Sequence, residues 1–282
     1  MSRMPRASSA GTDAEPTTRR RLVVAAGTLV LATASMLTGC ASGGGSAASS
    51  SATVEADAAP TTITVFAAAS LTEAFDTLAA QFEAEHPNVD VVLSYGGSAA
   101  LAQQVLEGAP VDVFASAAEP PMQTVGDAGL AVDPVVFATN TLELAVPAGN
   151  AAGVRGLDDL ADTDLRIALC DPSVPCGAAS EKLLAQEGVT AAPDTLESDV
   201  KAVLTKVSLG EVDAALVYRT DVQSAGEEVE GIEVPGAASV VNRYPIAALA
   251  EAADAETAAD FVAFVTGAAG RQVLTEAGFG AP

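Results

Sequence analysis

The stretch that decides the fold is residues 63–82, which read ITVFAAASLTEAFDTLAAQF. Its first four residues, 63–66, are typical of a short strand because they are mainly β-branched or aromatic. Ser70 and Glu73 stand three positions apart and predict a capping box, with Ser70 as the N-cap of a helix. Apolar residues then recur with helical spacing, at Phe75, Leu78, Ala79 and Phe82. The stretch therefore predicts a strand that passes directly into a helix.

The same alternation continues along the chain. The pattern predicts further strands at residues 90–94, 111–115, 165–169 and 214–217. It predicts helices around residues 101–106, at 178–186, within 196–209 and over 255–277. Alternating strands and helices indicate an α/β fold with parallel sheets covered by helices.

Ser70 and Ser98 both follow predicted strands and begin predicted helices. Ligands of open α/β sheets bind at the carboxyl ends of parallel strands. The first N–H groups of a helix are unpaired, and the helix dipole favours negative charge there. We therefore expect an anion site at these helix starts that needs no cation.

Length and composition limit the classes of protein. The 282 residues suffice for one large or two medium domains, and 49% of them are apolar, enough for a substantial core. The formal net charge is −24, and the first 39 residues hold five Arg against two acidic residues, so the remainder carries −27. Such an acidic surface repels nucleic acid and anionic lipids, so we expect no nucleic-acid partner.

The N-terminus has the pattern of an export signal. Three arginines at 19–21 precede an uncharged apolar run at 22–37, which is short for a membrane span. The run ends in Leu37-Thr38-Gly39-Cys40, which resembles the lipobox of bacterial lipoproteins. This resemblance implies a signal peptide at 1–39, acylation of Cys40 and a flexible Ser/Gly/Ala tether at 40–60. A retained signal anchor is the alternative, and the export route, general secretory or twin-arginine, stays open.

Export predicts an extracytoplasmic protein, held at the cell membrane only through its lipid. Disulfides persist in that compartment. Once Cys40 carries lipid, two cysteines remain, so Cys170 and Cys176 are a possible disulfide pair.

Several short motifs resemble the periplasmic molybdate-binding proteins of ABC importers and occur in that family's order. The resemblance covers nearly all of residues 61–282. The motifs are ITVFAAASLT at 63–72, YGGS at 95–98 with LAQQ at 101–104, EGAPVDVF at 107–114, DPSVP at 171–175, DV at 199–200, LVY at 216–218 and YPI at 244–246.

The resemblance implies a type II periplasmic-binding-protein fold, with two α/β lobes and a ligand cleft between them. Lobe 1 would comprise residues 61–139 plus 240–282, and lobe 2 residues 140–239. By motif position, the molybdate oxyanion would be bound by the hydroxyls of Ser70, Ser98 and Tyr218 and by the backbone N–H groups of Cys176 and Val200. The metal would enter only as the oxyanion, so we expect no bare metal ion and no cofactor.

This donor set suits a tetrahedral dianion, which can only accept hydrogen bonds. Tungstate has the same charge and shape, so we expect it to bind as well, whereas sulfate is smaller and a rigid cavity can reject it. The chain departs from the family at Cys170, Cys176 and Gly97, where Gly, Ala and Ser are common. Cys176 can still donate its N–H group, and Ser98 keeps the hydroxyl.

Other functions remain as alternatives. The same fold could bind sulfate or phosphate, whereas three tyrosines are too few for a typical iron site. An enzyme is disfavoured because the single His, His86, precedes Pro87 in a polar loop, and no nucleotide-binding or hydrolase motif occurs. The family resemblance further implies a membrane permease and a cytoplasmic ATPase as partners of a monomer. Asp112 and Arg219 are given no role, although Arg219 is a cation beside the expected site.

Overall fold

The computed structural model describes residues 60–282. The predicted signal peptide, Cys40 and the tether before Pro60 lie outside this range. Within it, nine strands pair in the order β2-β1-β3-β9-β4-β7-β5-β6, and β8 also pairs with β4. Two sheets arise because the first part of β4 pairs with β9, whereas its last part pairs with β7 and β8. The α/β fold expected from the sequence is confirmed.

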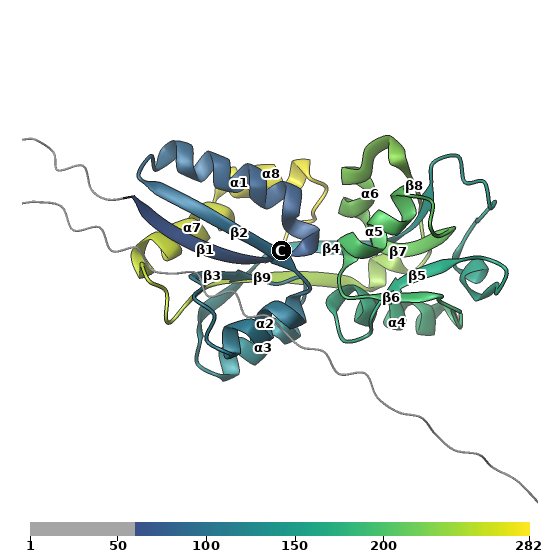
Figure 1. Ribbon diagram of the computed structural model, residues 1–282, viewed down its shortest axis with the longest axis horizontal. Helices are drawn as coiled ribbons and strands as arrows, with labels where there is room; N and C mark the ends of the chain where they lie inside the picture. Colours follow the sequence, from purple (N-terminus) through teal and green to yellow (C-terminus); the bar gives the residue numbers. More distant parts are fainter. Residues whose placement is uncertain (1–59) are drawn as a thin grey trace, which may run out of the picture. The chain divides into compact units, whose positions relative to one another are not determined.

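Lobe 1 is built on β1, β2, β3, β9 and the first part of β4. Parallel pairing joins β1 to β2 and to β3, whereas β3 and β9 are antiparallel. The helices α1 and α8 lie on one side of this sheet, and α2 and α3 lie on the other (Figure 1). The elements are β1 (Thr61–Ala68), α1 (Thr72–Glu85), β2 (Val89–Gly96), α2 (Ser98–Leu106), β3 (Val113–Ala115), α3 (Glu119–Asp127), β9 (Val241–Leu249), α7 (Ala255–Thr266) and α8 (Ala268–Glu276).

Lobe 2 repeats this organisation around a second sheet. Strand β5 pairs in parallel with β6 and β7, and β4 pairs antiparallel with β7 and β8. The elements are β5 (Ile167–Cys170), α4 (Pro175–Glu187), β6 (Thr195–Glu197), α5 (Val200–Ser208), β7 (Ala214–Tyr218), α6 (Arg219–Ala225) and β8 (Val229–Ile232), with 3-10 turns at Leu157–Ala161, Gly226–Glu228 and Ala237–Ser239.

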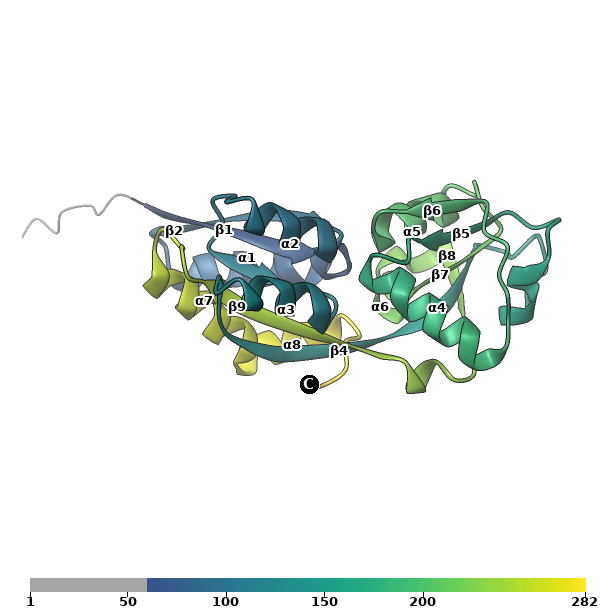
Figure 2. The ribbon, with the colours of Figure 1, turned by 90° about the horizontal axis from the view of Figure 1, so that it is seen from below.

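The long strand β4 (Ala131–Pro147) connects the two sheets. Its pairing with β9 ends at Thr141, and its pairing with β7 begins at the next residue, Leu142. Strands β4 and β9 together run between the two groups of elements (Figure 2). The sequence pattern at 131–147 and 241–249 did not indicate these crossing strands.

Helices cover both faces of β1, and the side chains of the strand alternate accordingly. Ile63 and Val65 pack in the same cluster as Phe75 and Phe82 of α1. Phe66 packs on the opposite side, with α2 and α3. Burial of both faces explains the nearly continuous apolar run that the sequence shows here.

The C-terminal helical region is two helices, not one. Helix α7 ends at Thr266 and α8 begins at Ala268, with Gly267 in extended conformation between them. Both helices pack against lobe 1 through Phe261, Val265 and Val273. Among residues 60–282, the helices are too short or too polar to cross a lipid bilayer.

Candidate anion-binding site

A small cavity lies between the two lobes, and both lobes contribute to its wall. The cavity is small, so it suits a compact solute rather than a sugar or a peptide. The lining residues are 68–70, 96–98 and Ala117 from lobe 1, and 174–176, Asp199, Val200 and Tyr218 from lobe 2.

The starts of four helices meet at this cavity. Ser98 and Val200 are the first residues of α2 and α5, and Cys176 is the second residue of α4. Their N–H groups precede the first intrahelical hydrogen bond and are therefore free to bind a ligand. Ser70 lies in a 3-10 turn (Ala69–Leu71) that leads into α1. The converging helix starts present free N–H groups and the positive ends of helix dipoles to an anion, while the wall holds one acidic side chain, Asp199, and no cationic one.

The structure brings together all five residues predicted to bind the anion, since Ser70, Ser98, Cys176, Val200 and Tyr218 all line this one cavity. Their side chains are almost fully buried. The hydroxyls of the two serines come from lobe 1, whereas the tyrosine and both amides come from lobe 2. A solute bound here would contact both lobes at once.

The predicted capping box at Ser70 is wrong. Leu71 is the N-cap of α1, without a side-chain cap, because the 3-10 turn displaces the helix start. The Ser70 hydroxyl instead lies 3.0 Å from the Tyr244 hydroxyl. Thr72 donates a hydrogen bond to the Ala69 carbonyl and stabilises the turn. Ser70 is thereby free of the helix and faces the cavity.

Burial keeps the two tyrosines in the site protonated. The pKa of Tyr218 lies well above its ordinary value, because of burial and, secondarily, the neighbouring Tyr244 and Asp221. Burial likewise raises the pKa of Tyr244. The two rings pack edge to face, with centroids 6.0 Å apart. At neutral pH, Tyr218 is therefore a neutral hydroxyl donor.

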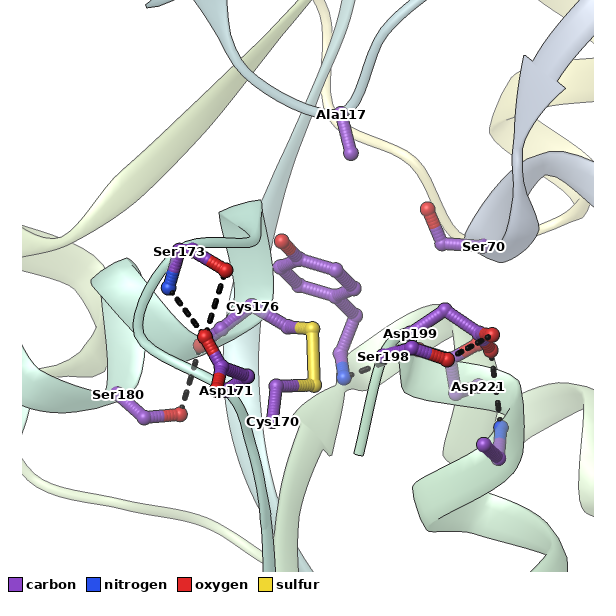
Figure 3. Close-up of a disulfide and its surroundings, with 12 residues drawn as sticks. Ser70, Ala117, Cys170, Asp171, Ser173, Cys176, Ser180, Ser198, Asp199 and Asp221 are labelled. Carbon is purple, nitrogen blue, oxygen red and sulfur yellow. Dashed lines mark hydrogen bonds between the residues drawn. A yellow bond between two sulfur atoms is a disulfide. The ribbon is translucent and has the colours of Figure 1, made fainter. Parts of the chain in front are cut away.

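A disulfide joins Cys170 to Cys176, with the two Cα atoms 5.7 Å apart. Cys170 ends β5 and Cys176 lies in the first turn of α4, so the bridge ties the helix start to the strand (Figure 3). The same turn packs tightly: a Cβ at Gly177 would collide with the Asp171 carbonyl. The position of the Cys176 N–H group is thus fixed from two directions.

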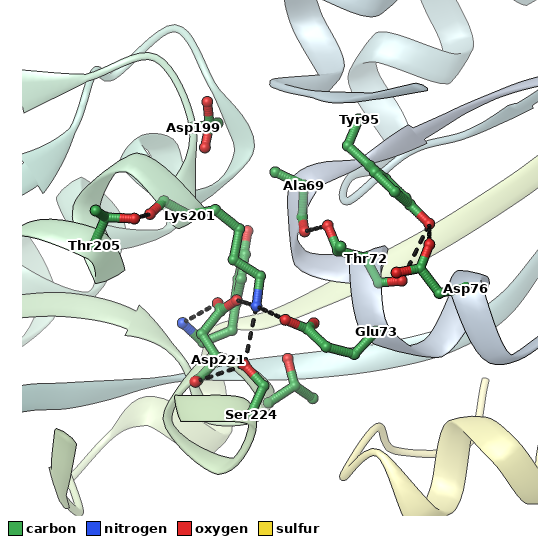
Figure 4. A network of polar contacts seen from close by, with 12 residues as sticks. Ala69, Thr72, Glu73, Asp76, Tyr95, Asp199, Lys201, Thr205, Asp221 and Ser224 are labelled. Carbon is green, nitrogen blue, oxygen red and sulfur yellow. Dashed lines mark hydrogen bonds and ion pairs between the residues drawn. The ribbon is translucent and has the colours of Figure 1, made fainter. Parts of the chain in front are cut away.

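A polar network crosses the cleft beside the cavity (Figure 4). Lys201 of α5 forms ion pairs with Glu73 of lobe 1, at 2.7 Å, and with the buried Asp221 of lobe 2, at 3.3 Å. It also donates to the Ser224 hydroxyl. Burial raises the pKa of the Asp221 carboxyl to about 6, and the charge of Lys201 partly opposes this shift. The network was not predicted from the sequence, since Glu73 and Lys201 are 128 positions apart.

The other residues singled out in the sequence lie elsewhere. Arg219 is exposed and lines a different pocket, together with Glu143 and Glu233. His86 is partly exposed and stacks on Phe82. Asp112 is buried and accepts hydrogen bonds from the backbone of Thr64 and Ala253. Within residues 60–282, no cluster of three acidic, His or Cys side chains could hold a metal cation.

Two asparagines behind the cavity were missed. Asn140 and Asn242 are buried and face each other as paired residues of β4 and β9. Asn242 donates to the Tyr218 hydroxyl and to the Ala117 carbonyl, both at 3.0 Å. Only the pairing of the two crossing strands brings them together, and a single asparagine in a sequence carries no such signal.

Two α/β lobes joined by crossing strands, with a small donor-lined cavity between them, define a two-lobed solute-binding protein. The family model for bacterial extracellular solute-binding proteins matches residues 63–280. This chain belongs to that family.

Individual relatives and solved structures of the same kind are similar to this chain. The chain is 44% identical over 221 residues to the molybdate-binding protein ModA of Mycobacterium tuberculosis, which covers 78% of this chain and 85% of that protein. The substrate-binding domain of a putative molybdenum ABC transporter from Clostridium difficile superposes with a TM-score of 0.60 at 26% identity, covering 79% of this chain and 99% of that one. The periplasmic molybdate-binding protein of Azotobacter vinelandii gives a TM-score of 0.63 at 24% identity over 78% and 99% of the two chains.

Proposed function

We propose that this protein binds molybdate outside the cytoplasm and delivers it to an ABC importer. The observation that carries this proposal is one small cavity lined by three hydroxyls and two helix-start amides, without a cationic side chain on its wall. The 44% identity to molybdate-binding relatives supports the same ligand. The family consists of binding proteins, so the role is capture and transport rather than catalysis.

The proposed ligands are the hydroxyls of Ser70, Ser98 and Tyr218 and the N–H groups of Cys176 and Val200. Molybdate at neutral pH carries no proton, so each of its oxygens needs donors, and neutral preorganised donors suffice. Binding without a salt bridge also permits release to a permease. Tungstate offers the same charge and geometry, so we propose that it competes for the site.

Closure around the anion provides the transport signal. Because the ligands come from both lobes, only a closed protein satisfies all of them, and a permease can recognise that state. The proposed lipid at Cys40 and the tether after it would keep the protein beside a permease and its ATPase. We propose that the protein acts as a monomer.

Calorimetric titration of the purified protein with molybdate, tungstate, sulfate and phosphate tests the proposal. Calorimetry is suitable because the chain has no Trp to report binding. We expect one-to-one binding of molybdate and tungstate and no heat from the other two anions. Comparable affinity for sulfate or phosphate would instead support the alternative of another oxyanion.

Single substitutions then test the ligand set. Ser70→Ala, Ser98→Ala and Tyr218→Phe each remove one donor to a charged ligand, so affinity should fall about tenfold or more. Ser239→Ala is the matched control. The Ser239 hydroxyl bonds to Gly236, away from the cavity. The affinity of this variant should match the wild type.

A further inference from the structure

The two buried asparagines form a pair at one position of the crossing strands. Asn140 of β4 and Asn242 of β9 are directly opposite each other in the antiparallel ladder. Side chains of opposed residues lie on the same face of a sheet. Neither asparagine lines the cavity, but each contacts a tyrosine hydroxyl beside it.

The orientation of the Asn242 amide follows from its neighbours. Its nitrogen lies 3.0 Å from the Ala117 carbonyl oxygen, which can only accept, and 3.0 Å from the Tyr218 hydroxyl oxygen. One amide hydrogen goes to each. The Tyr218 oxygen is therefore an acceptor from Asn242, and its own proton must point elsewhere. Since Tyr218 lines the cavity, its proton can point to a bound anion there.

Asn140 acts on the Ser70 hydroxyl, through Tyr244. Its carbonyl oxygen accepts from the Thr141 N–H group, so its nitrogen faces Thr220, at 2.8 Å, and Tyr244, at 3.4 Å. Tyr244 accepts from Asn140 and can donate its proton to Ser70, 3.0 Å away. Ser70 then keeps its own proton for the cavity.

The Tyr218 and Tyr244 hydroxyls are also close enough to interact with each other, so the amides behind them compete with this contact for the direction of each proton. The Ser98 hydroxyl also accepts a hydrogen bond from behind, because its oxygen accepts from the Ala117 N–H group. All three hydroxyls on the cavity wall can thus accept from a group behind them. An asparagine amide is well suited to this task because its NH₂ group can only donate, which fixes the direction of each bond.

We propose that Asn242 and Asn140 are positioning residues for the anion: their amides occupy the acceptor side of the Tyr218 and Tyr244 hydroxyls and so direct the protons of Tyr218 and Ser70 into the cavity. This inference rests on the proposed function and adds to it the residues that direct the hydroxyl protons toward the anion.

Double-mutant cycles with molybdate test the inference. Asn242→Leu removes the amide at similar size, and Asn242→Asp replaces a donor with an acceptor. Each is titrated in the wild-type and Tyr218→Phe backgrounds, and Asn140→Leu is titrated with and without Tyr244→Phe. The Phe background is the matched control. There, an asparagine substitution can still change packing and stability, but it can no longer act through the missing tyrosine hydroxyl.

We expect Asn242→Leu to weaken molybdate binding about tenfold in the wild-type background and at most about twofold with Tyr218→Phe. Asn242→Asp should show the same non-additivity, which keeps the test valid if the Leu variant does not fold. The near-UV tyrosine difference spectrum caused by molybdate should be reduced in Asn242→Leu. Equal losses in both backgrounds would show a purely structural role and overturn the inference. A wild-type protein that ignores molybdate would instead contradict the proposed function itself.

Discussion

The Nζ atom of Lys201, on α5 of lobe 2, lies 2.7 Å from Oε1 of Glu73, on α1 of lobe 1. This ion pair spans the cleft next to the cavity, three residues from Ser70 and one from Val200 in the chain. It forms only when the lobes approach each other. It therefore adds to the stability of the closed state without contacting the ligand.

Replacing Glu73 isolates this cross-cleft contact. Glu73→Gln should weaken molybdate affinity about two- to fivefold, the range expected for a partly exposed ion pair, mainly through faster release. Stopped-flow and calorimetric measurements at low and high salt check this. Glu85→Gln removes the same charge from an exposed position on the same helix and should have no effect. Equal effects of the two variants would indicate only a change in net charge.

Gly97 allows the lobes to meet. A Cβ at this position would collide with the backbone oxygen of Ser198 in the other lobe. Gly97→Ala should therefore hinder closure and lower affinity by at least about tenfold, although its backbone angles suit alanine and folding should be normal. Gly96→Ala is the control, because its Cβ would make an ordinary contact, 3.6 Å from Leu101. Unchanged affinity of Gly97→Ala would show that this contact does not limit closure.

The role of the Val200 amide can be tested with proline. Val200 is the first residue of α5, where proline is tolerated, and the preceding Asp199 is extended, as a residue before proline should be. Val200→Pro removes the N–H group and should weaken binding about tenfold or more. Val200→Ala keeps the amide but loses buried side-chain volume, so stability should fall while affinity stays within about threefold. If Val200→Ala lost as much affinity as Val200→Pro, the loss would result from side-chain packing and not from the missing N–H group.

Asp221 makes stability depend on pH in an unusual direction. Its folded-state pKa of about 6 exceeds the ordinary value of 3.8, so the folded protein holds this proton more tightly than the unfolded chain. Stability should therefore fall as pH rises from about 4 to 6, by up to about 3 kcal/mol from this group. Asp221→Asn should thus gain stability relative to the wild type over this range, as measured by denaturant unfolding at several pH values.

Asp213 provides a control of opposite sign. Its hydrogen bonds with Arg166 lower the pKa of the carboxyl, so its contribution is present above the unfolded pKa and lost as pH falls. Asp213→Asn should lose stability relative to the wild type as pH rises. If Asp221→Asn behaved in the same way, Asp221 would be a charged partner of Lys201 at all these pH values.

Much of the fold and two residues of the candidate site, Ser70 and Ser98, follow from local sequence. The run at 63–82 predicts β1 and α1, because burial on both strand faces and on one helix face leaves a readable apolar pattern. Ser70 and Ser98 could be predicted near helix starts from this local pattern, whereas Cys176, Val200 and Tyr218 were predicted only from the resemblance to a known family. The crossing strand β4 could not be predicted in this way, because its residues 133–135 are exposed and its pairing partner changes midway along the strand.

The sequence by itself determined the α/β class and the presence of hydroxyls and free amides at the starts of helices. It did so because strand and helix periodicity and helix starts are local properties of a chain. The tertiary structure alone decided that Ser70 bonds to Tyr244, 174 positions away, rather than capping α1. It likewise paired Asn140 with Asn242 and brought Lys201 to Glu73. These contacts depend on how the two lobes and their crossing strands pack, and that packing leaves no periodic trace in the sequence.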